Sequence, residues 1–100
     1  MSYNFFVYIT TNPNRTVLYT GVTNDLPTRL QQHYEESKIS HKTFTGRYNC
    51  YNLLYYERFS DINHAIDREK EIKGWLRIKK ERLIESINPR WRFLNEEIQE

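Results

Sequence analysis

Three short stretches of the chain, at residues 5–10, 17–22 and 51–59, are dense in β-branched and aromatic side chains. Such side chains suit a pleated, half-buried surface, so each stretch is predicted to be a β-strand. Asn-Pro-Asn at residues 12–14 separates the first two stretches and is a typical turn sequence. The first two strands are therefore predicted to form a hairpin.

A helical spacing follows the second strand, where Leu26, Leu30 and Tyr34 recur at intervals of four residues. This spacing places the three side chains on one face of a helix. Asp25 or Asn24 is suited to cap the first turn by accepting hydrogen bonds from its free N–H groups. The sequence therefore predicts an amphipathic helix from this cap to about Tyr34.

The second half of the chain carries two further helical patterns, at residues 61–75 and 77–87. The first pattern begins at a cap formed by Asp61. The second ends at Asn88, because a residue before proline avoids the α-helical region. Residues 37–51 show little apolar periodicity and are predicted to form a long loop.

These elements together predict a three-stranded antiparallel sheet flanked by helices, an α/β (α+β) fold. Four large side chains are expected to pack the C-terminal helices onto the sheet: Trp75, Leu76, Leu83 and Ile84. A chain of 100 residues suffices for one domain. This domain is expected to span residues 1–95 and to be followed by an acidic tail at residues 96–100.

Three ionisable residues lie on or beside the predicted apolar stripes. Arg29 and His33 are four residues apart and flank the stripe of the first helix. They present a guanidinium and an imidazole on one flank of the helix, facing inward or along the border of the stripe. The alternative is that both lie at the core edge with their polar ends in water. Glu69 falls on the core-facing stripe of its helix, where a carboxylate is costly unless it is paired or bound to a metal. A salt bridge from Arg29 and a bound cation both satisfy Glu69, and the sequence leaves both open.

Two tyrosines, Tyr8 and Tyr19, occupy the two strands of the predicted hairpin. If the hairpin is symmetric about Pro13 and Asn14, the tyrosines lie directly opposite, with Cβ atoms roughly 5 Å apart. Two phenols paired in this way are either ordinary packing or part of a site.

The order and spacing of Tyr8 in Val-Tyr-Ile, Tyr19 in Tyr-Thr-Gly, Arg29 and Glu69 resemble the GIY-YIG nuclease family. The resemblance covers the chain from about residue 3 to about residue 94. It is closest to the small, stand-alone bacterial members with a single domain. It implies that the two tyrosines lie near the scissile phosphate, that Arg29 contacts this phosphate, and that Glu69 holds one divalent cation, Mg²⁺ or Mn²⁺.

The same resemblance implies a divalent-metal-dependent endonuclease of DNA, with a role in DNA repair as the expectation. Whether the DNA is branched, damaged or ordinary duplex is left open. The general base is left open between a tyrosine and His33. Two departures from the family pattern are Val22 in place of a lysine and Asn88 as a late counterpart of an asparagine. They keep two alternatives open, a nucleic-acid-binding module without turnover and a protein-interaction domain. A protein partner that supplies specificity and the oligomeric state are also left open.

Charge is distributed unevenly along the chain. The formal net charge is only +2, yet Lys and Arg outnumber Asp and Glu over residues 38–82. Six cations from this region are expected to contact phosphates, against the alternative of an ordinary solvated surface. They are Lys38, Lys42 and Arg47 in the predicted loop, and Lys73, Arg77 and Lys80 in the C-terminal helices.

The remaining composition narrows the classes of protein. A single cysteine, Cys50, cannot form an internal disulfide, which suits a reducing cytosol. The three histidines show no metal-ligand spacing. The sequence shows no signal peptide and no apolar run near about 18 residues, so no membrane contact and a cytoplasmic location are expected.

Overall fold

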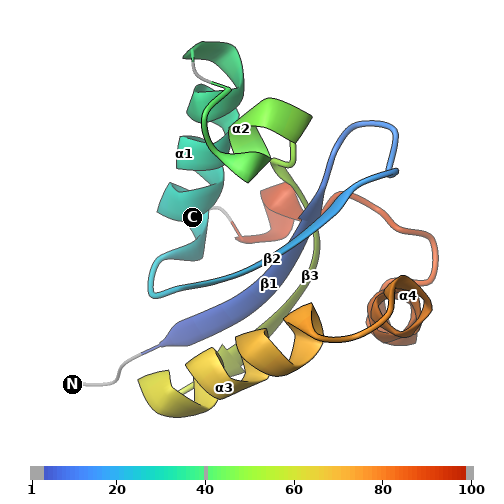
Figure 1. Cartoon of the computed structure of the whole chain (residues 1–100). Helices are drawn as coiled ribbons and strands as arrows, with labels where there is room; N and C mark the ends of the chain where they lie inside the picture. The colour runs from blue at the N-terminus through green and yellow to red at the C-terminus, as the bar shows by residue number, and fades with distance from the viewer. Residues whose placement is uncertain (1–3, 40, 99–100) are drawn as a thin grey trace.

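The computed structural model describes residues 4–39 and 41–98 and shows one three-stranded sheet with helices on both faces (Figure 1). The elements in chain order are β1 (Phe5–Thr11), β2 (Leu18–Thr23), α1 (Leu26–Ile39), α2 (Phe44–Tyr48), β3 (Asn52–Phe59), α3 (Ile62–Lys73), α4 (Arg77–Ile87) and the 3-10 helix η1 (Asn95–Ile98). The strand order is β2-β1-β3, and both pairings are antiparallel. The predicted α+β fold is confirmed. None of the described helices is long and apolar enough to cross a bilayer.

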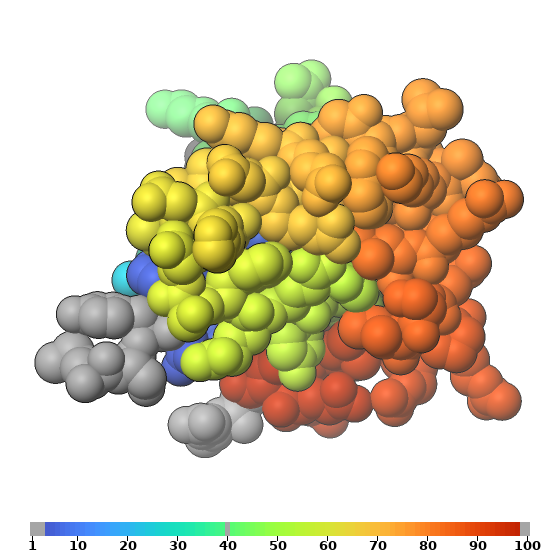
Figure 2. All heavy atoms as spheres, turned by 90° about the horizontal axis from the view of Figure 1, so that it is seen from below, coloured from blue at the N-terminus to red at the C-terminus, as the bar shows by residue number. Residues whose placement is uncertain are grey.

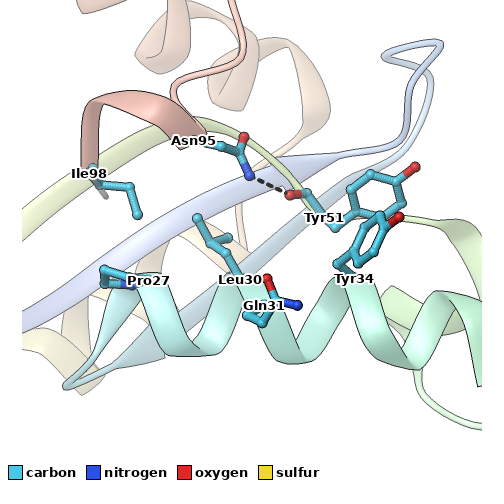
Figure 3. A pocket seen from close by; sticks show the side chains of 7 residues that line it. All are labelled: Pro27, Leu30, Gln31, Tyr34, Tyr51, Asn95 and Ile98. Carbon is cyan, nitrogen blue, oxygen red and sulfur yellow. Dashed lines mark hydrogen bonds between the residues drawn. The ribbon is translucent and has the colours of Figure 1, made fainter. Parts of the chain in front are cut away.

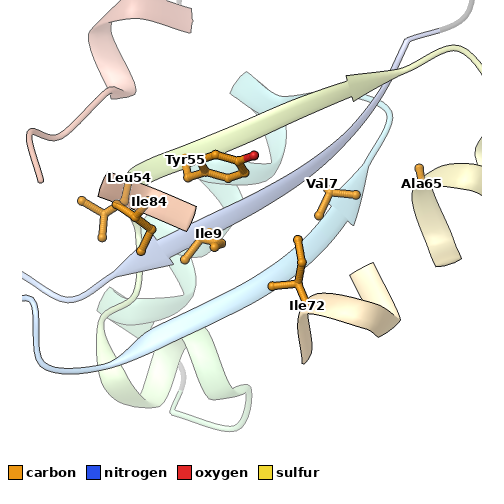
Figure 4. Close-up of a cluster of buried hydrophobic side chains, with 7 residues drawn as sticks. All are labelled: Val7, Ile9, Leu54, Tyr55, Ala65, Ile72 and Ile84. Atoms are coloured by element: carbon orange, nitrogen blue, oxygen red, sulfur yellow. The ribbon is translucent and has the colours of Figure 1, made fainter. Parts of the chain in front are cut away.

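Alternate residues of β1 point to opposite faces of the sheet and enter two separate cores. The core beneath α3 and α4 consists of Val7, Ile9, Leu54, Tyr55, Ala65, Ile72 and Ile84 (Figure 4). The core on the opposite face, beneath α1 and the C-terminal segment, consists of Tyr8, Leu26, Leu30, Leu53 and Leu94. The central strand therefore carries one phenol, that of Tyr8, into the core that α1 covers.

The β1–β2 hairpin differs in register from the symmetric one predicted. Tyr8 lies opposite Gly21, two residues away from Tyr19. The side-chain oxygen Oδ1 of Asn12 accepts hydrogen bonds from the backbone N–H groups of residues 16–17, at 2.8 and 3.0 Å, and so shifts the centre of the turn. The prediction of directly opposed tyrosines was wrong, but both remain on one face because side chains alternate with a period of two.

The first helix is longer than predicted and buries a different face. Asp25 caps it as expected, with Oδ1 accepting a hydrogen bond of 3.2 Å from the N–H of Thr28. Tyr34, predicted on the apolar stripe, is 42 % exposed, whereas His33 is completely buried. A helix has 3.6 residues per turn, so the buried stripe steps by three residues from Leu30 to His33. The alternative of an imidazole reaching water at the core edge was therefore wrong.

Residues 37–51 contain the end of α1 and the short helix α2, although the sequence predicted a loop. Thr43 caps α2 by accepting a 3.1 Å hydrogen bond from the N–H of Gly46. Asn49 ends the helix in the left-handed conformation, with φ of 60°. Both ends of α2 are thus set by side chains and turns that apolar periodicity does not detect. Position 40 lies outside the described residues.

The two C-terminal helices occur where the sequence placed them. Asp61 caps α3, and its Oδ1 accepts a 2.7 Å hydrogen bond from the N–H of Asn63. Trp75, Leu83 and Ile84 join the core beneath α3 and α4, as predicted. Leu76 does not, because it lies at the junction of the two helices and is 79 % exposed. Figure 2 shows this side of the molecule, with β3 visible between α3 and the C-terminal segment.

The chain after α4 returns to β3 and is fastened there by Asn88. Its Nδ2 donates to the backbone oxygens of Leu54 and Arg92, both at 2.9 Å, and its Oδ1 accepts from the N–H of Arg92 at 3.0 Å. Asn88 is almost completely buried. Asn88 was suggested by the sequence as the counterpart of a family asparagine. In the structure these three hydrogen bonds of its side chain join it to the backbone of the protein.

A second asparagine, Asn95, completes the fastening. Its Oδ1 accepts a 2.8 Å hydrogen bond from the N–H of Leu53, at the start of β3. The following helix η1 sets Ile98 against the core that α1 covers. Residues 96–98 of the expected acidic tail thus lie in η1, and residues 99–100 lie outside the described residues.

Candidate active site

Tyr8 lies on the central strand, and Gly21 on β2 leaves the room that its ring occupies. A Cβ built on Gly21 would lie 2.5 Å from the Tyr8 hydroxyl oxygen and 2.9 Å from Cε2 of Tyr19. Real Cβ atoms essentially never approach other heavy atoms so closely. Glycine is therefore required in Tyr-Thr-Gly because two phenol rings cover this position.

The Tyr8 hydroxyl is hydrogen-bonded to His33 on α1, with 2.8 Å between the oxygen and Nε2. The ring of Tyr19 lies beside both, with its centroid 6.2 Å from that of Tyr8 and 5.6 Å from that of His33. The other imidazole nitrogen, Nδ1 of His33, is buried and has no hydrogen-bond partner in the described part of the chain. We call Tyr8, Tyr19 and His33 the phenol–imidazole cluster.

Burial changes the acidity of both hydrogen-bonded groups. Burial lowers the pKa of His33 to about 4, and the positive charge of Arg29 adds to this effect. Burial raises the pKa of Tyr8 well above its ordinary value of 10, and the neighbouring Tyr19 adds to the rise. At neutral pH the cluster therefore contains a neutral phenol bonded to a neutral imidazole.

Glu69 approaches the cluster from α3. Only 15 % of its side chain is exposed, which agrees with its predicted place on the core-facing stripe. Its Oε1 lies 3.5 Å from Nζ of Lys73, one helical turn further on. The same Nζ lies 5.9 Å from the ring centroid of Tyr19. Lys73 therefore links the carboxylate to the phenol–imidazole cluster.

Arg29 approaches from α1 and does not make the salt bridge to Glu69 that the sequence left open as one alternative. Its Nη1 donates a 3.0 Å hydrogen bond to the side-chain oxygen of Gln32. Among the described residues, the cation paired with Glu69 is Lys73. Arg29 and Glu69 both influence the Tyr8 hydroxyl, because the first lowers its pKa and the second raises it. Side chains from β1, β2, α1 and α3 thus meet around one hydroxyl.

The cations predicted in the loop lie on the border of α1 and α2. Nζ of Lys38 lies 5.1 Å from the ring centroid of Tyr34, and the guanidinium carbon of Arg47 lies 5.6 Å from that of Tyr48. Lys42 is exposed between the two helices. The three cations therefore belong to the same side of the molecule as α2.

The cations predicted in the C-terminal helices have different neighbours from one another. Lys73 contacts the site, as described above. Arg77 donates a 2.7 Å hydrogen bond to the backbone oxygen of Thr16 and pairs with Glu81 at 2.9 Å, so it holds α4 to the hairpin turn. Lys80 is half-buried on α4. The expected contact of these cations with phosphates stays a prediction.

One neighbour of the cluster was missed by sequence reasoning. The ring of Phe44 on α2 stacks on that of Tyr19, with centroids 5.9 Å apart and planes inclined by 29°. Phe44 lies in the segment predicted as a loop. The available signal was the spacing of Phe44 and Tyr48, two aromatic residues four positions apart.

A pocket of about 230 Å³ lies between α1 and η1, beside the start of β3 (Figure 3). It is lined by Pro27, Leu30, Gln31, Tyr34, Tyr51, Asn95 and Ile98. At one end, Nδ2 of Asn95 donates a 2.9 Å hydrogen bond to the backbone oxygen of Tyr51. None of the predicted site residues lines it, so this pocket is separate from the phenol–imidazole cluster.

The described residues contain no group of three or more His, Cys, Asp and Glu side chains that could hold a metal ion. Glu69 stands near the cluster as a single carboxylate. A lone carboxylate suits Mg²⁺, which keeps several waters and accepts substrate phosphate oxygens as further ligands. The donor set therefore fits an ion whose coordination a substrate completes.

Comparison with known proteins gives consistent similarities. Residues 4–82 match the model of the family described as the GIY-YIG catalytic domain. The chain is 36 % identical over 84 residues to a UPF0213 protein from Natronomonas pharaonis, covering 84 % of this chain and 94 % of that protein. It is also 36 % identical over 85 residues to a UPF0213 protein from Oceanobacillus iheyensis, covering 85 % and 94 %. The solution NMR structure of a UPF0213 protein from Bacillus halodurans is similar with a TM-score of 0.55 and 30 % identity, covering 88 % of this chain and 89 % of the other.

Proposed function

The chain belongs to the GIY-YIG catalytic domain family, and we propose that it is a divalent-metal-dependent endonuclease that hydrolyses a phosphodiester bond of DNA. The matched region, residues 4–82, contains Tyr8, Tyr19, Arg29, His33 and Glu69. We assign these five residues to the catalytic site.

One observation carries the proposal, namely the set of groups around the Tyr8 hydroxyl. His33 is bonded to it at 2.8 Å, and Arg29 and Glu69 both change its pKa. Phosphodiester hydrolysis needs a proton acceptor for water, a cation for the phosphate and a ligand for a metal ion. Around Tyr8, His33 offers a proton acceptor, Arg29 a cation and Glu69 a ligand for a metal ion.

Glu69 is the residue that would hold the cation. Its carboxylate is largely buried, and Lys73 neutralises it at 3.5 Å in the free protein. A bound divalent cation would polarise the phosphoryl oxygen and stabilise the leaving alkoxide. Because Lys73 is the more exposed member of the pair, its ammonium is free to turn toward the substrate phosphate when the carboxylate binds metal.

The hydrogen bond between Tyr8 and His33 offers a path for the proton of the attacking water. In the tautomer with its proton on Nδ1, His33 accepts the phenol proton at Nε2 while the Tyr8 oxygen takes a proton from water. The water oxygen is then free to bond to phosphorus, and the proton ends on His33. Tyr8 never becomes a free phenolate, a form that its burial disfavours, whereas the imidazolium of His33, which burial also disfavours, lasts only until the proton is released.

Arg29 and the cations near α2 are assigned to the phosphates. The guanidinium of Arg29 offers a planar fork of donors that matches the oxygens of a phosphate. Lys38, Lys42 and Arg47 extend the positive charge along the border of α1 and α2, where they would meet neighbouring backbone phosphates.

The proposal is tested with labelled single-stranded, duplex and branched oligonucleotides, incubated with Mg²⁺, with Mn²⁺ or with EDTA. We expect product only when metal is present. Glu69→Gln and Arg29→Ala should each lower the rate about 100-fold or more, the size typical of losing one electrostatic stabiliser of a transition state.

A matched control is Asp67→Asn, which removes an exposed carboxylate from the same helix. This variant should cleave like the original protein. Cleavage that survives both Glu69→Gln and Arg29→Ala would contradict the assignment. DNA binding without product under every metal condition would favour the alternative of a binding module without turnover.

A further inference from the structure

The ring contacts of the site continue outward to the protein surface. Tyr19 stacks on Phe44 with centroids 5.9 Å apart, and Phe44 lies 4.8 Å from the ring centroid of Tyr48. Phe44 is 46 % exposed and Tyr48 is 41 % exposed, whereas Tyr8 at the inner end is fully buried. A line of aromatic rings therefore leads from the Tyr8 hydroxyl to solvent.

The way in which α2 is anchored keeps these outer rings exposed. Thr45 and Gly46 are its buried residues. Its cap, Thr43, donates a 2.8 Å hydrogen bond to Oε2 of Glu36 on α1. With this side fixed on α1, Phe44 and Tyr48 remain on the solvent side. We call these two residues the α2 ring pair.

Cations flank the line of rings at its outer end and at Tyr19. Arg47 lies over Tyr48 at 5.6 Å, and Lys73 lies over Tyr19 at 5.9 Å. Exposed aromatic faces combined with cations that track a phosphate backbone are the features by which proteins hold unpaired nucleotides. Regular duplex offers the cations its phosphates, but its base faces are covered by one another.

We propose that the α2 ring pair stacks the base of an unpaired nucleotide adjacent to the scissile phosphate, so that the preferred substrate contains a single-stranded segment. This inference rests on the proposed function, because it places the scissile phosphate at Tyr8 and Tyr19. The stacked base fixes the register of the strand, and Arg47 and Lys73 meet the phosphates on either side of it. Specificity then lies in the strand structure of the substrate and not in its sequence, because every base has a face that can stack.

The test measures binding without cleavage, in EDTA, with a short oligonucleotide that carries the fluorescent base 2-aminopurine. The same labelled strand is used single-stranded and in duplex. We expect tighter binding of the single strand and quenching of 2-aminopurine, which reports stacking. Phe44→Leu and Tyr48→Leu keep an apolar side chain without a ring, and each should weaken single-strand binding about tenfold and restore the fluorescence. Binding of the duplex should change by less than about twofold.

Phe93→Leu is the matched control, because Phe93 is an exposed phenylalanine in the segment after α4, with Arg15 of the hairpin turn over its ring at 4.1 Å. It should bind and quench like the original protein. Circular dichroism and thermal unfolding identify any variant that fails to fold. If one ring-pair variant does not fold, the other decides, together with the preference of the original protein for single strand over duplex.

The two proposals fail in different ways. Unchanged single-strand affinity and quenching in both ring-pair variants would overturn the inference while metal-dependent cleavage still supported the proposed function. Binding that depends on the rings but gives no cleavage would overturn the proposed nuclease function and would support stacking of an unpaired base on the α2 ring pair. Equal losses on single strand and duplex would also overturn the inference, since stacking predicts a selective loss.

Discussion

Gly21 lies directly opposite Tyr8 in the β1–β2 ladder, and the Tyr8 hydroxyl fills the space that a Cβ on Gly21 would need. We expect Gly21→Ala to push the Tyr8 ring out of place. The free energy of unfolding should fall by about 1–3 kcal/mol, as is typical of overpacking. Cleavage should fall more steeply than stability, because the displaced hydroxyl loses its bond to His33. Urea unfolding and a cleavage assay measure the two effects.

Gly74→Ala provides the comparison. A Cβ there would lie 3.5 Å from the nearest backbone oxygen, in ordinary contact, and the residue has right-handed helical angles. This change should be neutral or should stabilise the folded protein by about 0.4–1 kcal/mol, because alanine lowers the conformational entropy of the unfolded chain. Similar losses of stability and cleavage from both substitutions would show that the Tyr8 ring does not require a glycine at position 21.

Stability should depend on the protonation of His33 between pH 6.5 and about 4. The pKa of His33 is lowered to about 4 in the folded protein, against 6.5 for an ordinary histidine. Between these values the unfolded chain binds more protons, so stability is lost as the pH falls. The difference amounts to roughly 3 kcal/mol.

The variant that isolates this effect is His33→Gln, which offers Tyr8 a hydrogen-bonding side chain that does not titrate. Urea unfolding at a series of pH values should show a shallower dependence in this variant than in the original protein. Equal slopes in the two proteins would mean that His33 is not the group responsible. An NMR titration of the His33 ring protons reports its pKa directly.

Lys73 is predicted to compete with metal for Glu69. Its Nζ lies 3.5 Å from Oε1 of Glu69, and half of the lysine side chain is exposed. Because the ammonium of Lys73 is half in water, the pair is expected to contribute about as little as exposed pairs do, about 0.2–1 kcal/mol, so Lys73→Met should tighten metal binding by up to about fivefold. Amide shifts during a Mg²⁺ or Mn²⁺ titration measure the affinity, with Glu69→Gln as the variant that should not respond. Weaker metal binding in Lys73→Met would contradict this competition.

A second carboxylate, Glu57, is predicted to hold α3 on the sheet. It accepts hydrogen bonds from Nε and Nη2 of Arg68, at 3.0 and 2.9 Å, and a short one from the Tyr55 hydroxyl. Burial alone would raise the pKa of Glu57, but the bonds from Arg68 and Tyr55 outweigh it and hold the pKa below 4.5. Glu57→Gln should cost about 1–3 kcal/mol at neutral pH.

The sign of the pH dependence follows from the lowered pKa. The contribution of Glu57 is fully present above pH 4.5 and is lost as the pH falls through the lower pKa of the folded protein. Glu71→Gln is the matched control, since Glu71 binds the other side of Arg68 but is more than half exposed. Its removal should cost less than about 1 kcal/mol. A larger loss from Glu71→Gln than from Glu57→Gln would contradict the prediction.

The features that the sequence predicted correctly are those set by local patterns. The strands, the caps at Asp25 and Asp61 and the partly buried carboxylate of Glu69 each follow from spacing or from the chemistry of a few adjacent residues. The family resemblance was carried by the same kind of information, and the match over residues 4–82 confirms it.

The features that were missed depend on contacts between distant or unlike groups. The hairpin register follows the hydrogen bonds of Asn12 within the turn. The residue types of the turn do not indicate which of several possible turns forms. Helix α2 has five residues and includes a glycine, so neither length nor propensity identifies it. The burial of His33 in place of Tyr34 requires a hydroxyl partner, Tyr8, that lies 25 positions away.

The strand order β2-β1-β3 has a consequence for the newly made chain. The hairpin that carries both tyrosines forms from the first 23 residues, and α1 with His33 follows it. The central strand gains its second neighbour when β3 emerges, and Glu69 comes later still, on α3. The residues assigned to proton transfer are therefore translated before Glu69, the residue assigned to the metal. If Glu69 holds the metal, the site cannot bind metal, and so cannot cut nucleic acid near the ribosome, until α3 has been translated.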